Sequence, residues 1–395
     1  MKKISIILNV IFTLGCVISL THPMHVCAQD MPFDPLTGIF DTTILNRNNQ
    51  FNALQDQLKC NPPVDTKGVY LTAYSASSKD RIDWVIERAK QGLINAVVID
   101  IKDDSGRLTI SADNPILNDY GVSINIIDNI ESIIKRLKDN GIYTIARIVT
   151  FKDPFIAEIR NDWALHLQDG SLYRDGQGLA WVDPYNQDVW DYVLQTAYEA
   201  VNVGFNEIQF DYIRFCTERK VNQVVYDEAI VNGRSQIDAI TQALKYFYEH
   251  LKPLGVYVSA DVFGAVIDNP IDQASVGQRY SDLALYCDYI SPMIYPSHYG
   301  NGAFGLKVPD LQPYECIDGA LKASNAVLQP YIEQGTKVAK VRPWLQDFTA
   351  SYLRVYKKYT YEEVQEQIQA TYDNGYKGYL LWNAANVYHL KPDVE

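Results

Sequence analysis

The sequence predicts a single-domain α/β protein, a (β/α)8 TIM barrel with an N-terminal extension. Short β-branched runs alternate with amphipathic helical segments, a pattern typical of a parallel sheet. Eight such runs within roughly 320 residues favour a closed barrel over an open sheet. The chain of 395 residues is 47% hydrophobic and 21% charged, so it can form a large core and is not expected to be disordered.

The predicted strands share an apolar run that leads into a polar loop. They are Gly68–Ala73, Ala96–Lys102, Ile142–Val149, Glu207–Tyr212, Val256–Val262, Tyr289–Tyr295, Val341–Gln346 and Gly378–Asn383. Apolar residues at helical spacing predict helices between them, among which are Arg81–Gln91, Ile126–Asp139, Asp188–Val203 and Val364–Asn374. Gly375 follows the last of these helices as a suitable C-cap.

The N-terminus has the pattern of an export signal. Lys2 and Lys3 precede a mostly apolar stretch over residues 4–20, and Val26-Cys27-Ala28 then supplies small residues for cleavage. The alternative is a retained membrane anchor, but the apolar stretch is short for a span. We expect a signal peptide over residues 1–28, a linker or wrap over 29–66 and the barrel over 67–395. The mature protein is then exported, to the cell envelope, the periplasm or the exterior, without a stable membrane span.

Charge and cysteine content narrow the range of partners. The 35 basic and 48 acidic residues give a net charge of −13, which argues against nucleic acid as a partner. The cysteines that remain after cleavage are Cys60, Cys216, Cys287 and Cys316. They lack the spacing of a metal site, so we expect no metal and no cofactor. Cys287 is expected to be a buried thiol, and a Cys216–Cys316 disulfide is one of the pairings that export would permit.

Polar side chains recur where the predicted strands end. Alternation along two strands places Asp211 and Asp261 inside the barrel, and Asp100 and Lys102 share the inner face of a third. Active sites of this fold lie at the carboxyl ends of the strands. We therefore expect the substrate-binding residues there: Tyr74, Asp100, Lys102, Arg147, Arg214, Tyr295, His298, Trp344, Gln346, Trp382 and Asn383. Asp103 and Asp104 form an acidic loop that could bind sugar hydroxyls or a divalent ion, or could simply be solvated.

Asp211 and Asp261 are the candidate catalytic pair. They end neighbouring strands, which lie about 4.8 Å apart in a sheet. Hydrolysis of a glycosidic bond needs one carboxyl group to protonate the leaving oxygen and another to attack the sugar or activate water. The alternative is a structural pair that is salt-bridged to Arg147, Arg214 or Lys102.

Several motifs resemble a bacterial family of glycoside hydrolases that was first catalogued as a domain of unknown function and is placed among the TIM-barrel glycosidases. The motifs are Gly68-Val69-Tyr70-Leu71-Thr72-Ala73-Tyr74, Val98-Ile99-Asp100-Ile101-Lys102-Asp103, Gln209-Phe210-Asp211-Tyr212-Ile213-Arg214-Phe215, Ser259-Ala260-Asp261-Val262-Phe263-Gly264 and the run from Tyr289 to Tyr299. The resemblance spans roughly Gly68 to Tyr388. It implies that Asp211 and Asp261 are the family's acidic positions.

These observations favour a glycosidase that acts on a cell-envelope or extracellular polysaccharide. Asp211 would be the nucleophile or base and Asp261 the acid, or the reverse. Two alternatives stay open at this point. One is a barrel that binds carbohydrate without catalysis, and the other is a hydrolase of another bond, such as a metal-dependent polysaccharide deacetylase. The presence of only 6 histidines weighs against the deacetylase.

Overall fold

The structure is a computed structural model that describes residue 61 and residues 64–391. The predicted signal peptide, Cys60 and most of the predicted extension over residues 29–66 lie outside these described residues. Within the described part, no helix combines the length and the apolar character that a membrane span requires.

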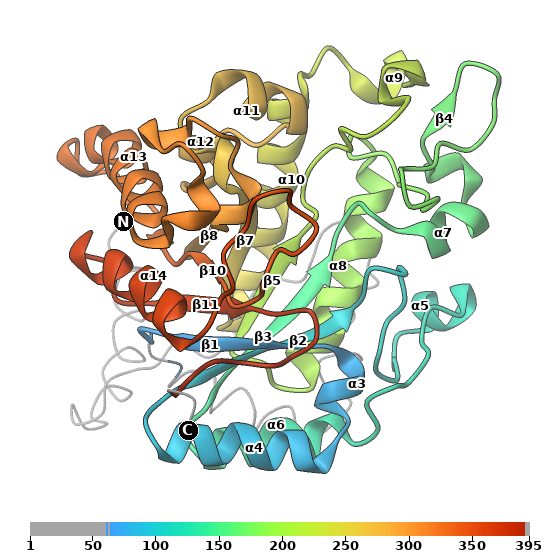
Figure 1. The fold of residues 1–395 in the computed structure, drawn as a ribbon. Coiled ribbons are helices and arrows are strands. Elements are labelled where there is room, and N and C mark those ends of the chain that lie inside the picture. The colour runs from blue at the N-terminus through green and yellow to red at the C-terminus, as the bar shows by residue number, and fades with distance from the viewer. Residues whose placement is uncertain (1–60, 62–63, 392–395) are drawn as a thin grey trace, which may run out of the picture.

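A closed parallel barrel forms the centre of the molecule (Figure 1). Its strands are β1 (Lys67–Leu71), β2 (Ala96–Lys102), β3 (Tyr143–Val149), β5 (Glu207–Asp211), β7 (Tyr257–Phe263), β8 (Tyr289–Met293), β9 (Lys340–Val341), β10 (Trp344–Gln346) and β11 (Tyr379–Trp382). Neighbours along the chain pair in parallel, and β11 pairs with β1 to join the last strand to the first. The predicted (β/α)8 barrel is thereby confirmed.

The seventh strand position of the barrel is divided between β9 and β10. Arg342 and Pro343 separate the two short strands, and a proline has no N–H to donate to a sheet. On one side of this break Val341 pairs with Ile290 of β8, and on the other Trp344 pairs with Met293 of the same strand. The barrel therefore closes through β8, although the strand Val341–Gln346 that the sequence predicts is not continuous.

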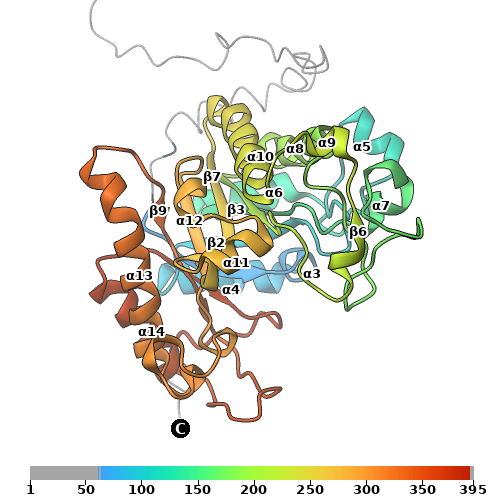
Figure 2. The same ribbon diagram turned by 90° about the horizontal axis from the view of Figure 1, so that it is seen from above.

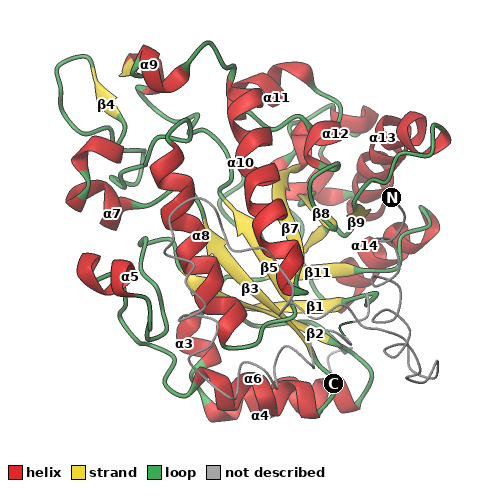
Figure 3. Ribbon diagram, turned by 180° about the vertical axis from the view of Figure 1, so that it is seen from behind, coloured by secondary structure: helices red, strands yellow, loops and turns green. Residues whose placement is uncertain are grey.

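Helices surround the barrel on its outer face (Figures 1 and 3). The helices that follow successive strands are α4 (Lys79–Lys90), α6 (Ile130–Asp139), α8 (Gln187–Asn202), α10 (Gln236–Leu251), α11 (Pro270–Val276) with α12 (Tyr280–Leu283), α13 (Pro313–Glu333) and α14 (Tyr361–Asp373). No helix follows β11 within residues 383–391. The outer ring is therefore complete except after the last strand of the described chain.

Local sequence sets where these helices begin. The helix predicted over Ile126–Asp139 starts later, at Ile130, because Asn129 has a left-handed φ of 57° that a continuous helix cannot contain. α10 and α14 begin at capping boxes, in which Ser235 pairs with Asp238 and Thr360 with Glu363. In each box, backbone N–H groups that have no partner in the first turn are satisfied by side chains.

The hydrophobic core lies between the barrel and its helices. Phe210 of β5 points outward and stacks on Phe247 of α10, with ring centroids 4.5 Å apart. Residues 207, 209 and 211 of the same strand face inward, in agreement with the predicted alternation. At the amino end of the barrel interior, Arg342 donates two hydrogen bonds to the carboxylate of Glu207, and both side chains are buried. This pair satisfies two charges that would otherwise be costly to bury.

Two long connections extend the carboxyl end of the barrel. One lies between β3 and α8 and contains α7 (Pro154–Ile159) and β4 (His166–Leu167). The other lies between β5 and α10 and contains β6 (Val224–Val225) and α9 (Glu228–Val231). β4 and β6 pair in an antiparallel ribbon, so the two connections support each other. Figure 2 shows this region on the opposite side of the barrel from α13 and α14.

The three described cysteines are buried free thiols. The prediction for Cys287 is confirmed, and the Cys216–Cys316 disulfide considered from the sequence is absent. Cys216 instead lies 3.1 Å from the hydroxyl of Tyr173.

Candidate active site

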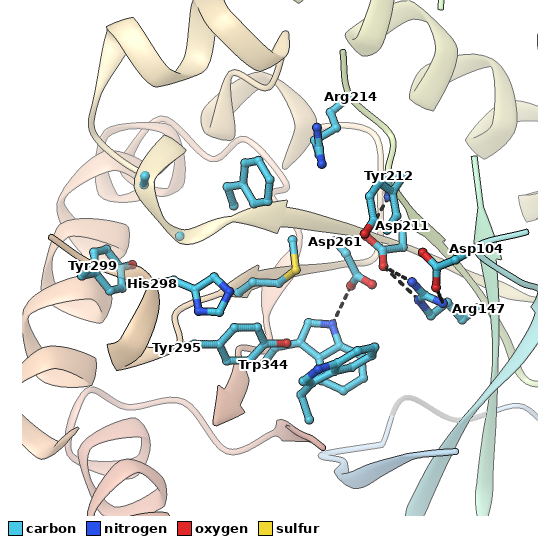
Figure 4. Close-up of a pocket in the computed structure, with 15 residues that line it drawn as sticks. Asp104, Arg147, Asp211, Tyr212, Arg214, Asp261, Tyr295, His298, Tyr299 and Trp344 are labelled. Carbon is cyan, nitrogen blue, oxygen red and sulfur yellow. Dashed lines mark hydrogen bonds and ion pairs between the residues drawn. The ribbon is translucent and has the colours of Figure 1, made fainter. Parts of the chain in front are cut away.

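A cavity of about 470 Å³ opens at the carboxyl end of the barrel (Figure 4). It is lined by residues of β3, β5, β7, β8, β10 and β11 and of the loops that follow β2, β5, β7 and β8. The lining residues are Asp104, Arg147, Asp211, Tyr212, Arg214, Asp261, Phe263, Gly264, Ala265, Met293, Tyr295, His298, Tyr299, Trp344 and Trp382. This is the place where enzymes of this fold hold their catalytic groups.

Asp211 and Asp261 reach this cavity from adjacent strands. Phe210 of β5 pairs with Ala260 of β7, so the two aspartates occupy the next position along each strand. Figure 4 shows their carboxyl groups facing the same space. The structure thus brings together the two side chains that the sequence selects as a pair.

Asp211 is held by donors on both of its oxygens. Its Oδ2 accepts hydrogen bonds from Nε and Nη2 of Arg147, at 2.9 and 2.6 Å. Its Oδ1 accepts one from the backbone N–H of Tyr212, at 2.7 Å. Every one of these partners is a donor, and hydrogen bonds of this kind stabilise the charged form of a carboxyl group. Asp211 is therefore placed as a carboxylate.

Asp261 is in a different environment. Its side chain is buried, and its Oδ1 accepts a hydrogen bond from Nε1 of Trp344 at 2.8 Å. Burial raises the pKa of Asp261 well above its usual value, and the negative charge of Asp211 raises it further. The Trp344 hydrogen bond and the positive charge of Arg147 act in the opposite direction but are weaker. Of the two carboxyl groups, Asp261 is therefore the one that holds a proton more readily.

Arg147 connects Asp211 to the interior of the barrel. Its Nη1 donates to Oδ1 of Asp100 at 2.7 Å, and Asp100 also accepts from the hydroxyl of Tyr70 at 2.5 Å. Burial raises the pKa of Asp100 to about 6. The array of Tyr70, Asp100 and Arg147 fixes the guanidinium that orients Asp211. Asp100 lies behind Arg147 and does not line the cavity.

Tyr212 adopts a strained backbone conformation next to Asp211. Its φ is 49°, in the left-handed region that residues other than glycine rarely occupy. This turn directs its N–H to Asp211 and leaves its ring on the cavity wall. Such strain is common where a backbone must present a functional group.

Aromatic side chains form the rest of the wall. The rings of Trp344 and Trp382 meet edge to face with centroids 5.6 Å apart, and Trp382 stacks on Tyr70 at 4.2 Å. The rings of Tyr295 and His298 also meet edge to face, with centroids 5.1 Å apart. Burial lowers the pKa of His298, which favours the neutral imidazole. Flat apolar faces with polar tips are suited to sugar rings.

Besides Asp100, three of the residues that the sequence places in the site do not line the cavity. Tyr74 is on the short helix α3 (Ala73–Ala76), is 73% exposed and does not line the cavity. Gln346 is fully buried and donates to Asp310 and to the carbonyl of Phe348. Asn383 donates to the backbone carbonyls of Asp347, just after β10, and of Val387, after β11. These contacts hold loops at the rim together.

Lys102 is also away from the cavity, contrary to the expected inner face shared with Asp100. The pairing of β2 with β3 shifts register between Asp100 and Lys102, which reverses the alternation. The Lys102 ammonium is fully buried, 2.8 Å from Oδ2 of Asp153, and it donates to the carbonyl of Val149. These contacts with Asp153 and Val149 stabilise the fold.

Other lining residues were not selected from the sequence. Tyr212 directly follows Asp211, Phe263 ends the Asp261 strand and Gly264 follows it, so the quoted motifs contain these three residues. Ala265 is the next residue along the chain. A Cβ at Gly264 would lie 2.7 Å from the carbonyl oxygen of Met293, which explains why a glycine stands there. Met293 ends β8 and Tyr299 lies in the loop after it, and both belong to the motif run from Tyr289 to Tyr299.

The acidic loop at Asp103 and Asp104 folds on itself. Oδ1 of Asp103 accepts hydrogen bonds from the backbone N–H and hydroxyl of Ser105. Asp104 lies 3.6 Å from Arg147 and lines the cavity. Within residues 61 and 64–391, no cluster of three or more His, Cys, Asp or Glu side chains is arranged to hold a metal ion.

A closed parallel barrel with paired carboxyl groups at its carboxyl end defines the class of TIM-barrel glycoside hydrolases. Residues 68–388 match the family described as "Putative glycosyl hydrolase domain", and the chain belongs to this family. The resemblance noted in the sequence is thereby confirmed. Among curated proteins, none matches this chain.

Two solved structures, those of the Bordetella bronchiseptica and Thermotoga petrophila proteins, support the same fold. The glycoside hydrolase domain of PgaB (BpsB) from Bordetella bronchiseptica is 13% identical, with a TM-score of 0.55 over 82% of this chain and 95% of its own. The endo-1,4-β-D-mannanase of Thermotoga petrophila RKU-1 is 14% identical, with a TM-score of 0.51 over 84% and 93%. A hypothetical protein from Ruminiclostridium thermocellum ATCC 27405 is 36% identical over 49% of this chain and 97% of its own, with a TM-score of 0.45.

Proposed function

We propose that this chain hydrolyses a glycosidic bond in a cell-envelope or extracellular polysaccharide by a two-carboxylate mechanism. The observation that supports this most directly is the contrast between two carboxyl groups on adjacent strands. Asp211 accepts two hydrogen bonds from Arg147, whereas burial and the charge of Asp211 raise the pKa of Asp261. A charged carboxylate beside a neutral carboxylic acid is what glycoside hydrolysis requires.

In this proposal each carboxyl group has its own role. Oδ1 of Asp261 accepts from Trp344, so its Oδ2 can carry the proton toward the leaving glycosidic oxygen. As that oxygen gains the proton, the bond to the sugar carbon breaks. Asp211 either attacks this carbon or takes a proton from a water that does so. Where Asp211 attacks, water then breaks the bond between Asp211 and the sugar carbon and gives its proton to Asp261, which restores both groups. Where Asp211 takes the proton of the attacking water, Asp211 loses that proton to solvent and Asp261 regains one from solvent.

The aromatic wall supplies the sugar platform in this proposal. Trp344 is only 1% exposed and fills the barrel while it donates to Asp261. Trp382 is half-buried and lines the same cavity, so its face is the one open to a sugar ring. Tyr295 and His298 line another part of the same cavity, where a hydroxyl-rich ligand would find both apolar contact and hydrogen bonds.

Export is part of the proposal because it places the enzyme next to its substrate. Its support is the signal pattern of residues 1–28 in the sequence. Expression of the full chain in a bacterial host, followed by mass analysis of the mature N-terminus, tests it. A chain that begins at Gln29 and is found outside the cytoplasm supports export, and an intact N-terminus on a cytoplasmic protein contradicts it.

Incubation of the purified protein with a panel of bacterial and plant polysaccharides tests the activity through released reducing ends. We expect the wild type to release them, and Asp261→Asn and Asp211→Asn to lose at least 10²-fold in rate, as expected for removal of a general acid or a nucleophile. Binding of polysaccharide without release by the wild type would favour the non-catalytic barrel. Release of acetate in place of reducing ends would favour a deacetylase.

A further inference from the structure

Arg214 is a buried cation on the cavity wall that has no carboxylate partner within the described residues. It is 7% exposed, and its one hydrogen bond to the protein runs from Nη1 to the carbonyl of Phe215, at 3.0 Å. Arg147, in the same cavity, differs because it is paired with Asp211 and Asp100. A guanidinium removed from water without a counterion is unfavourable, so such a group is usually completed by a ligand.

Three aromatic rings hold this guanidinium in place. Its central carbon lies 4.6 Å from the ring centroid of Phe263 and 5.0 Å from those of Trp181 and Tyr212. Trp181 is itself anchored by a hydrogen bond from Nε1 to Asp175, at 3.1 Å. Aromatic faces attract the charge but cannot accept the in-plane N–H bonds of the guanidinium. The remaining donors of Arg214 are thus oriented but unused.

The position of Arg214 relates it to a bound sugar. It lines the same cavity as Asp211 and Asp261, and Figure 4 draws it on the other side of Asp261 from Trp344. A sugar ring on the tryptophan side therefore presents its substituents toward Arg214. One cavity therefore includes Arg214 and both carboxyl groups.

We propose that Arg214 binds a singly charged anionic substituent of the substrate, a carboxylate or a sulfate ester carried by the sugar. The inference rests on the proposed function for the glycan part of the ligand. A planar guanidinium with free in-plane donors is matched to such a group, to which it can donate two hydrogen bonds. A single charge fits because Asp104 and Asp211 line the same cavity and would repel a more highly charged group.

The alternative is that Arg214 only packs between its aromatic neighbours. That role would need the side chain but no anion on the ligand. Matched ligand pairs separate the two: glucuronate with glucose, galacturonate with galactose and mannuronate with mannose, each pair differing in the carboxylate at one carbon. Glucose 6-sulfate serves as the sulfate arm.

Calorimetric titration of these ligands into Asp261→Asn tests the inference without turnover. Asn at this position keeps an acceptor for Trp344. We expect at least one uronate, or the sulfated sugar, to bind at least 10-fold tighter than its neutral partner. Arg214→Met should remove that preference and Arg214→Lys should retain part of it. Arg160→Met is the matched control, because Arg160 also contacts a ring, that of Trp163, but outside the cavity.

The outcomes separate this inference from the proposed function. Equal affinity within every pair, or no binding of any anion at the highest concentration, overturns it. A preference that survives in Arg214→Met also overturns it. A protein that prefers an anionic sugar through Arg214 but cleaves no polysaccharide loses the proposed hydrolysis and keeps the anion site. An active enzyme with no such preference keeps the hydrolysis and loses the anion site. Uronate-selective and sulfate-selective results identify which anion the site takes.

Discussion

Arg147 donates two hydrogen bonds to a single oxygen of Asp211, from Nε at 2.9 Å and from Nη2 at 2.6 Å. The guanidinium is itself fixed by Asp100, so the orientation of the carboxylate is set from inside the barrel. A carboxylate that must attack a sugar carbon, or remove a proton from water, gains from such fixed geometry, because little reorganisation remains at the moment of reaction.

Replacement of Arg147 by Met is therefore expected to reduce both activity and stability. Loss of the guanidinium leaves Asp211 and Asp100 as buried carboxyl groups without a countercharge, which costs about 3 kcal/mol of unfolding free energy. We expect kcat to fall by about 10²-fold because Asp211 loses its orientation. Urea unfolding and rates on the polysaccharide that the panel identifies provide the two measurements.

Two further variants control this experiment. Arg147→Lys keeps the charge but cannot make the paired hydrogen bonds, so it should recover stability more than rate. Arg174→Met removes an exposed ion pair with Glu158, which is worth less than about 1 kcal/mol. A kcat for Arg147→Met within twofold of the wild type would contradict the proposed positioning of Asp211.

In the proposed mechanism, Trp344 influences the alkaline limit of activity through Asp261. Its Nε1–H stabilises the charged form of this carboxyl group and so lowers its pKa, against the larger effect of burial. Trp344→Phe removes the donor, and the pKa of Asp261 should rise. Because the acid must be protonated to act, the alkaline limb of the kcat/KM profile should move to higher pH. Rates measured across the pH range give this limb directly.

Trp382→Phe is the matched variant for that experiment. Trp382 lines the same cavity but makes no hydrogen bond to Asp261, so its replacement should raise KM and leave the alkaline limb where it is. A limb that moves to lower pH in Trp344→Phe, or one that moves equally in both variants, is incompatible with Asp261 as the acid.

Much of the fold and the central pair of this site could be predicted from the sequence, because both depend on simple periodicity. Runs of β-branched residues between amphipathic helices define a parallel barrel. The period of two along β5 and β7 then fixes which residues face inward, and Asp211 and Asp261 fall at the strand ends where this fold holds its chemistry.

The rest of the site depends on local departures from that periodicity. The register shift after Asp100 turns Lys102 away from the interior, and no residue type in the run marks it. Pro343 is visible in the sequence, but the division of one strand into β9 and β10 follows from pairing with β8. The sequence also does not show that Arg214 has no carboxylate partner among the described residues, because this depends on which side chains the fold brings close to it.

Lys102 departs from the strand periodicity, and its replacement tests whether it supports the fold or binds substrate. Its ammonium and the carboxylate of Asp153 are both fully buried, 2.8 Å apart, and Oδ1 of Asp153 also accepts the backbone N–H of Ile156 at the start of α7. Lys102→Met leaves Asp153 without its countercharge and should cost about 3 kcal/mol of unfolding free energy. Because Lys102 does not line the cavity, KM for the polysaccharide should stay within twofold in the folded protein. A large rise in KM at unchanged stability would instead place Lys102 in substrate binding.

Asp183 gives a prediction for stability against pH that is independent of the active site. It is 7% exposed, and its Oδ1 accepts the backbone N–H of Tyr185 at 2.9 Å. Burial raises the pKa of Asp183 from 3.8 to about 6. The folded state therefore binds this proton more tightly than the unfolded state does, and the contribution of Asp183 to stability falls as pH rises from about 4 to about 6.

Asp183→Asn removes the titration and keeps the acceptor for Tyr185. Above the folded pKa, the variant should be more stable than the wild type by about 3 kcal/mol, the linkage energy of a shift of this size. At pH 4, where the wild-type carboxyl group is largely protonated, the two proteins should be alike. Urea unfolding at pH 4 and pH 8 measures the difference, and the exposed Asp119→Asn, which should change stability little at either pH, serves as the control. An Asp183→Asn protein that is less stable than the wild type at pH 8 would show that the charged carboxylate is favourable there, and that its burial is outweighed by the positive charge of Arg234.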